Sequence, residues 1–151
     1  MKALIQRVTE ASVTIRETGD IRSIGKGMVV FLGVGYEDSD EDIEYLCKKI
    51  SALRIFDDSE GIMNLAIGDI EGGELLVVSQ FTLMADTSRG NRPGYSKAAR
   101  GEVSQPLYES FVKQIRHKSG CRVVTGVFGA DMLVQIHNDG PVTILIDSKQ
   151  K

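Results

Sequence analysis

The sequence predicts an α+β fold, a mainly antiparallel sheet or partly closed β-barrel with two packed α-helices. Two segments carry apolar residues at helical spacing, and most of the others alternate apolar and polar residues as β-strands do. Strands and helices do not alternate regularly along the chain, which argues against a doubly wound parallel sheet. No repeat, low-complexity tract or linker divides the 151 residues, so we expect residues 1–151 to form a single domain.

The first third of the chain has the pattern of β-strands. Apolar and polar residues alternate from Ala3 to Ile15, and the phase of this alternation shifts near Val8, which predicts a β-bulge. Two glycine-containing turn signals follow. The continuous apolar run Met28–Val34 then predicts a central strand that is covered on both faces.

Two helices and four further strands are expected. Asp40–Leu53 places its apolar side chains along one stripe, and Ser39 followed by Asp42 is a capping-box pattern. Ser104–Lys118 has the same spacing. The expected strands are Glu74–Leu83, Arg122–Val127, Met132–His137 and Pro141–Asp147. The tight-turn residues Asn138–Gly140 predict that the last two strands form a hairpin.

Composition limits the class of protein. The chain is 42% hydrophobic and 26% charged with a net charge of −3, which is ordinary for a globular protein and argues against one that coats nucleic acid. Met1–Thr9 lacks the apolar stretch of a secretory signal, and no segment has the length of a membrane span. Cys47 and Cys121 form no C-x-x-C pair and are expected to be reduced and buried. These features predict a cytoplasmic protein that does not bind membranes.

Several familiar chemistries lack their residues in this sequence. The two histidines, His117 and His137, belong to no metal-binding cluster, and there is no G-x-S-x-G elbow, so we expect neither a metal site nor a Ser-His-Asp triad. Gly33–Gly35 follows a strand but lacks the third glycine of a dinucleotide site, and a phosphate-binding P-loop is missing. An enzyme of this sequence is therefore expected to work without a cofactor and without a histidine base.

Polar groups gather at two places. Ser79–Leu83 puts hydroxyls and an amide at the end of an apolar strand, where unpaired backbone N–H groups can stabilise an oxyanion. Asn138–Thr143 places a Gly-Pro pair between polar residues. Taken alone, each segment is more typical of an ordinary strand end or hairpin turn.

The segment Thr87–Gly101 is locally basic. It contains no acidic residue, and Tyr95 adds an aromatic face. Such a loop can hold a phosphate backbone by charge, although a solvated surface loop has the same composition. The candidate tRNA-binding residues are Arg89, Arg92, Lys97 and Arg100.

Over essentially its whole length the sequence resembles the D-aminoacyl-tRNA deacylases of bacteria and eukaryotes. The resemblance is carried by Met1–Val8, Ser79–Leu83, Arg92-Pro93, Phe128–Met132 and Asn138–Thr143. It implies a barrel-like homodimer in which the Gly140-Pro141 pair of one subunit, joined by a cis peptide bond, enters the active site of the other. It also implies hydrolysis of D-aminoacyl-tRNA. If the Gly-Pro backbone rejects L-amino acids, glycyl-tRNA should be accepted as well.

The resemblance also implies residue roles. Backbone N–H groups of Phe81 and Thr82 would hold the oxyanion, and the ribose 2′-hydroxyl of the substrate would help to activate water. Arg7 would brace the Gly-Pro corner. The catalytic set is Ser79, Gln80, Phe81 and Thr82, and the substrate-binding set is Arg7, Met132, Gly140 and Pro141.

The residues alone leave two other functions open. One is a non-catalytic dimeric barrel that binds RNA through Thr87–Gly101. The other is a conventional hydrolase of small esters or amides with Ser or Thr82 as nucleophile, which the lack of a suitable histidine base counts against.

Overall fold

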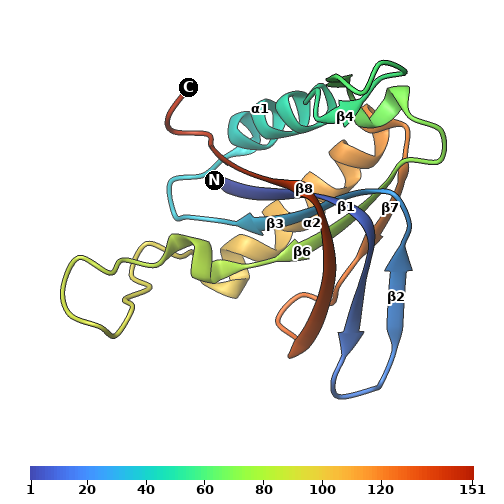
Figure 1. Cartoon of the computed structure of the whole chain (residues 1–151). Helices are drawn as coiled ribbons and strands as arrows, with labels where there is room; N and C mark the ends of the chain where they lie inside the picture. Colours follow the sequence, from blue (N-terminus) through green and yellow to red (C-terminus); the bar gives the residue numbers. More distant parts are fainter.

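The computed structural model describes residues 1–151 and contains a mixed sheet, nearly closed into a barrel, with two helices packed on one face (Figure 1). This arrangement confirms the α+β class, the partly closed barrel and the two helices. The elements are β1 (Lys2–Ile15), β2 (Ile21–Ile24), β3 (Gly27–Gly33), α1 (Asp40–Ser51), β4 (Phe56–Asp57), β5 (Met63–Leu65), the 3-10 helix η1 (Ile67–Asp69), β6 (Glu74–Ser79), the 3-10 helix η2 (Phe81–Met84), α2 (Gly101–Ser119), β7 (Arg122–Thr125) and β8 (Met132–Asp147).

Strand β1 organises the sheet. It pairs antiparallel with β3 through its first half, with β2 through its second half and with β8 along most of its length. By contrast, β3 pairs with β6 and β6 with β7 in parallel. The sheet therefore contains more parallel pairing than predicted. The reason is that α1 lies in the connection from β3 to β6 and α2 in the connection from β6 to β7, and such crossovers return the chain in the same direction.

The two central strands are buried on both faces, as the apolar run Met28–Val34 predicted. On one face, β3 and β6 pack against α1 and α2 in a core of 22 buried residues. On the other face, Val29, Leu76 and Val78 pack against the curled ends of β1, β2 and β8. Helix α1 begins as predicted, since the carboxylate of Asp42 accepts a hydrogen bond from the N–H of Ser39 at 2.8 Å.

Arginine side chains bridge β2 and β7, which are not paired by a strand ladder. Arg22 Nη1 donates to the carbonyl oxygens of Thr125 at 2.9 Å and Gly126 at 3.3 Å. In the reverse direction, Arg122 Nη1 on β7 donates to the carbonyl of Ser23 at 3.4 Å. These arginine–carbonyl hydrogen bonds, which we call the arginine seam, link β2 to β7 where no backbone ladder closes the barrel.

The predicted hairpin at Asn138–Gly140 is wrong. Strand β8 runs antiparallel to β1 on both sides of this segment without reversing. Gln6 pairs with Thr143 and Val8 with Asn138, so residues 139–142 bulge outward opposite Arg7 alone. The pairing is also shifted just after Val8, which confirms the bulge predicted in β1.

Candidate active site

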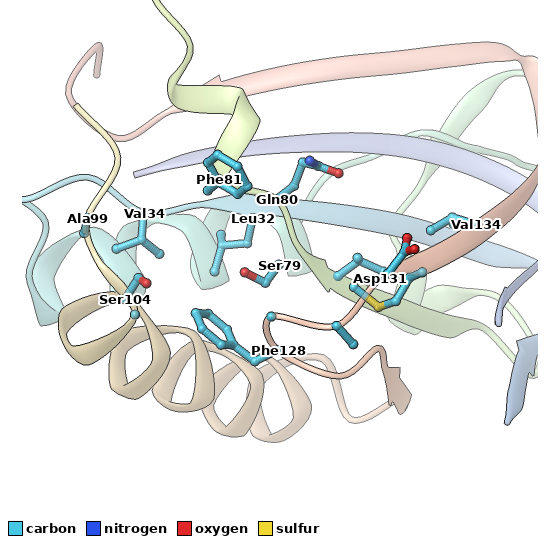
Figure 2. Close-up of a pocket in the computed structure, with 15 residues that line it drawn as sticks. Leu32, Val34, Ser79, Gln80, Phe81, Ala99, Ser104, Phe128, Asp131 and Val134 are labelled. Atoms are coloured by element: carbon cyan, nitrogen blue, oxygen red, sulfur yellow. The ribbon is translucent and has the colours of Figure 1, made fainter. Parts of the chain in front are cut away.

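A cavity of about 470 Å³ opens where β3 and β6 end (Figure 2). Because these two strands are parallel, their carboxyl ends lie at the same edge of the sheet, where open α/β sheets commonly bind ligands. The volume is that of a small-molecule site, roughly 300–1,000 Å³. The cavity is lined by Leu32, Val34, Val78, Ser79, Gln80, Phe81, Ala99, Gly101, Ser104, Phe128, Gly129, Ala130, Asp131, Met132 and Val134.

The end of β6 supplies the polar side of the cavity. The strand ends at Ser79, before the predicted end at Leu83, and η2 follows. The N–H of Gln80 still donates to the carbonyl of Leu32 at 2.8 Å. The next two amides, those of Phe81 and Thr82, open η2 and donate to no protein acceptor. Two adjacent backbone donors are therefore available beside the cavity.

The predicted catalytic residues come together. Ser79, Gln80 and Phe81 line the cavity with Met132, and Figure 2 shows Ser79 and Phe81 on one stretch of chain with Phe128 on the opposite side of the cavity. Thr82 is outside the lining, but its hydroxyl accepts a hydrogen bond from the side-chain amide of Gln80.

Sequence reasoning missed the lining residues Ala99 and Ser104, and it missed Tyr108, which lies outside the lining and packs against the lining residue Phe128. Tyr108 Oη donates to the carbonyl of Val77 at 3.0 Å, and its ring centroid lies 5.8 Å from that of Phe128. Burial raises the pKa of Tyr108 to about 12, so the hydroxyl remains a donor. Tyr108 lies within the predicted helix Ser104–Lys118, and the apolar spacing of that helix does not indicate which residue Tyr108 contacts. Ala99 and Ser104 gave no signal, because small residues of this kind are common in any core.

Gly140 and Pro141 do not line this cavity. They are exposed at the crest of the bulge, their peptide bond is cis, and Gly140 has φ +112°. Arg7 lies beneath them and is only 8% exposed. Its guanidinium donates to the carbonyl of Ile55 at 2.7 Å and to that of Asp139 at 3.3 Å.

The side chain of Asn138 bridges the two sides of the bulge at its base. Its side-chain amide donates to the carbonyl oxygens of Arg7 and Val142, both at 3.0 Å. Arg7 and the Gly140-Pro141 pair are thus brought together, but within one chain they form a separate group from the cavity.

The basic segment Thr87–Gly101 contains a loop that projects from the body of the molecule (Figure 1). Asp86 and Gly94 exchange backbone hydrogen bonds at 2.8 and 2.9 Å and so close its base. Lys97 Nζ lies 3.9 Å from the carboxylate of Asp86, which lowers the local positive charge. The four predicted tRNA-binding residues are all exposed: Arg89, Arg92, Lys97 and Arg100.

The remaining titratable candidates lie elsewhere. His137 Nδ1 is 3.3 Å from Glu10, and no group of three His, Cys, Asp or Glu side chains forms a candidate metal site. Both cysteines are free thiols; Cys47 is buried as predicted, whereas Cys121 is only half-buried. Burial raises the pKa of the Cys47 thiol to about 12.

Neither α-helix combines the length and apolarity needed to cross a membrane.

Residues 4–147 match the sequence profile of the family described as D-Tyr-tRNA(Tyr) deacylase. The chain is 59% identical over 152 residues to a D-aminoacyl-tRNA deacylase of Porphyromonas gingivalis, covering 100% of this chain and 99% of that one. It is 54% identical over 153 residues to the D-aminoacyl-tRNA deacylase of Chlorobaculum parvum, covering 100% of both chains.

Solved structures share the fold. One named c-Myc DNA Unwinding Element Binding Protein has a TM-score of 0.89 at 40% identity, over 97% of this chain and 98% of that one. One described as a probable eukaryotic D-amino acid tRNA deacylase has a TM-score of 0.83 at 16% identity, over 96% of this chain and 97% of that one. With the profile match and the full-length relatives, the chain belongs to the D-aminoacyl-tRNA deacylase family of hydrolases.

Proposed function

We propose that the protein hydrolyses the ester that joins a D-amino acid to the terminal adenosine of tRNA, and that it accepts glycyl-tRNA as well. The observation that carries this proposal is the convergence of Ser79, Gln80, Phe81 and Met132 on one cavity. Relatives that are 54% and 59% identical over the whole chain carry the same reaction in their names. The cavity holds the adenosine and the reacting ester.

The chemistry is attack of water on the ester carbonyl carbon. The carbonyl electrons move onto the oxygen, and the backbone N–H groups of Phe81 and Thr82 donate hydrogen bonds to this oxyanion. Each such donor lowers the barrier by about 3–4 kcal/mol. Collapse of the intermediate breaks the bond to the ribose oxygen, which takes up a proton, and releases the free amino acid and tRNA.

The water is activated by the 2′-hydroxyl of the substrate ribose and not by a side-chain base. Neither histidine lines the cavity. The carboxylate among the lining residues, that of Asp131, is 80% exposed and lies 3.5 Å from Arg16. Thr82 has a positioning role, because its hydroxyl is bonded to the Gln80 amide and has no adjacent base to activate it as a nucleophile.

L-amino acids are rejected by the Gly140-Pro141 corner of a second subunit. This corner is exposed and lies outside the cavity of its own chain, so a homodimer with reciprocal insertion would bring the two together. Leu133 and Leu145, on either side of the corner along β8, are 44% and 57% exposed, which supports a partner covering this strand.

The selection of D- over L-amino acids then follows, because the backbone of the corner sterically excludes L side chains. The carbonyl groups of the corner fix the substrate amino group, so an L side chain would collide with the Gly140-Pro141 backbone while a D side chain points away. A rejection of this kind is nearly independent of the amino acid attached, and glycine has no side chain to exclude.

The basic segment holds the tRNA backbone. The exposed side chains of Arg89, Arg92, Lys97 and Arg100 contact phosphates, so affinity falls as salt rises. We place this reaction in the cytoplasm, where aminoacylated tRNA is used.

The breadth of the substrate range tests the proposal. Deacylation of D-Tyr-tRNA, D-Asp-tRNA and Gly-tRNA by the purified protein should proceed at comparable rates. Activity confined to one D-amino acid would contradict exclusion by backbone alone, because it would require a side-chain pocket that selects the amino acid.

A further inference from the structure

An exposed aromatic pair lies at the rim of the cavity. The rings of Phe81 and Tyr95 meet edge to face, with centroids 5.0 Å apart and an interplanar angle of 69°. Phe81 is 55% exposed and Tyr95 is 39% exposed, so much of both rings faces solvent. Phe81 also lines the cavity, which places the pair where a ligand extends from the cavity to the surface.

Backbone hydrogen bonds hold both residues in place without a ligand. Tyr95 follows Gly94, which is fixed by its two bonds to Asp86. Phe81 begins η2 directly after Gln80, whose N–H is bonded to the end of β3. A surface that is already ordered loses little conformational entropy when a ligand binds.

Cationic residues flank Tyr95 in the sequence. Tyr95 lies between Arg92 and Lys97, and the side chains of Arg92 and Arg100 are exposed. Exposed aromatic rings interleaved with cations are typical of proteins that bind single-stranded nucleic acid, in which bases stack on the rings and phosphates contact the charges. The chemistry therefore favours a nucleotide over an apolar protein surface.

We propose that Phe81 and Tyr95 form a stacking platform for the base of the nucleotide that precedes the terminal adenosine of tRNA. This inference rests on the proposed function, in which the adenosine occupies the cavity and the preceding nucleotide is therefore at the rim. Stacking accepts any base because every base has an aromatic face, so the platform serves tRNAs irrespective of the amino acid they carry.

A substrate lacking one base tests the platform in the unmodified protein. D-Tyr-tRNA is prepared with an abasic residue in place of the nucleotide before the terminal adenosine, and its deacylation is compared with that of intact D-Tyr-tRNA. Loss of a stacked base should lower kcat/KM by about tenfold, mainly through KM. Equal kcat/KM for the two substrates would overturn the platform.

Substitutions of Tyr95 provide a second, independent test of the stacking platform. Tyr95→Ala should raise KM for intact D-Tyr-tRNA by about tenfold, whereas Tyr95→Phe, which keeps the ring, should stay within about twofold of the unmodified protein. On D-tyrosyl-adenosine, which has no preceding nucleotide, the loss in Tyr95→Ala should be several times smaller than on tRNA. The abasic residue and Tyr95→Ala together should cost little more than either alone.

The outcomes separate the platform from the proposed function. An equal loss on D-Tyr-tRNA and D-tyrosyl-adenosine in Tyr95→Ala would show that the ring only supports the fold around Phe81, which overturns the platform. If the unmodified protein hydrolyses neither D ester, the proposed function fails and the platform fails with it. Hydrolysis of both intact and abasic D-Tyr-tRNA at one rate leaves the proposed function standing and refutes the platform alone.

Discussion

A methyl group added to Gly140 would lie 2.9 Å from Arg7 Nη2 and 2.9 Å from Val142 Cγ2. The φ of +112° at Gly140 is also in a region that L side chains rarely adopt. Arg7 in turn is held by the carbonyl of Ile55 at 2.7 Å, so it has little freedom to withdraw. Arg7 therefore leaves no room for a side chain at position 140, at the crest of the β8 bulge.

Gly140→Ala is therefore expected to displace the corner. The strain is of order 1–3 kcal/mol. Deacylation of D-Tyr-tRNA should fall by about tenfold or more, because small misplacements of a positioning group are costly. The matched control is Gly19→Ala, at φ +72° with no atom within 4 Å of the added methyl group, which should lose stability but keep activity. Unchanged activity and D/L selectivity in Gly140→Ala would refute a role for this corner.

Thr82→Val tests whether the hydroxyl or the amide of this residue is used. Valine keeps the backbone N–H and the side-chain shape but removes the acceptor for Gln80. We expect kcat/KM on D-Tyr-tRNA to remain within about tenfold of the unmodified protein, whereas removal of a true nucleophile typically costs about 10⁶-fold. Loss on that larger scale would show that Thr82 attacks the ester.

The arginine seam makes a prediction about stability. Arg22 is 35% exposed and bonded to two carbonyl oxygens, whereas Arg122 is 61% exposed. Arg22→Ala should lower the free energy of unfolding by about 1–2 kcal/mol, since it leaves the Thr125 and Gly126 carbonyls unpaired. Arg122→Ala should cost less than about 1 kcal/mol, because the ion pair of Arg122 with Glu74, at 2.9 Å, lies at the surface. Urea unfolding of both variants measures this, and equal losses would contradict the assigned role of Arg22.

Asp42 should give the protein an acid-sensitive stability. Burial alone would raise the pKa of this carboxyl, but hydrogen bonds from Ser148 Oγ at 2.6 Å, Lys149 Nζ at 2.9 Å and the N–H of Ser39 hold it well below its usual range. Because the folded pKa is lower than the unfolded value, the stabilisation is complete above the unfolded pKa near 3.8 and is lost as pH falls towards the folded pKa.

Asp42→Asn provides the matched comparison for that prediction. The variant should be less stable at neutral pH by about 1–3 kcal/mol. Its stability should also fall less steeply than that of the unmodified protein as the pH falls below about 4. Parallel pH profiles for the two proteins, measured by urea unfolding, would show that Asp42 is not the titrating group.

Much of the fold follows from local patterns, and the exceptions arise from pairing between distant segments. Apolar periodicity located the helix from Asp40 and the buried strand through Met28–Val34 because both patterns depend on neighbouring residues. The parallel pairing of β3 with β6 has no local signature. Asn138–Gly140 has the residues of a hairpin turn, and only its pairing with β1 on both sides makes it a bulge.

The candidate site likewise contains some residues that could be predicted from the sequence and others that could not. Ser79 and Gln80 could be predicted because polar groups at the end of an apolar strand are conspicuous in a sequence. Ala99 and Ser104 could not, and neither could the contact of Tyr108 with Phe128, since these residue types are as common in any helix–sheet core. Their positions depend on how α2 and the residue Ala99 before it pack against the sheet.

Deacylation of matched D-Tyr-tRNA and L-Tyr-tRNA, with a chelator present, tests the central claim most directly. We expect rapid loss of the D ester while the L ester is spared, with no effect of the chelator. Equal hydrolysis of both esters would retain the hydrolase but refute the Gly140-Pro141 filter. Hydrolysis of neither would contradict the proposed reaction.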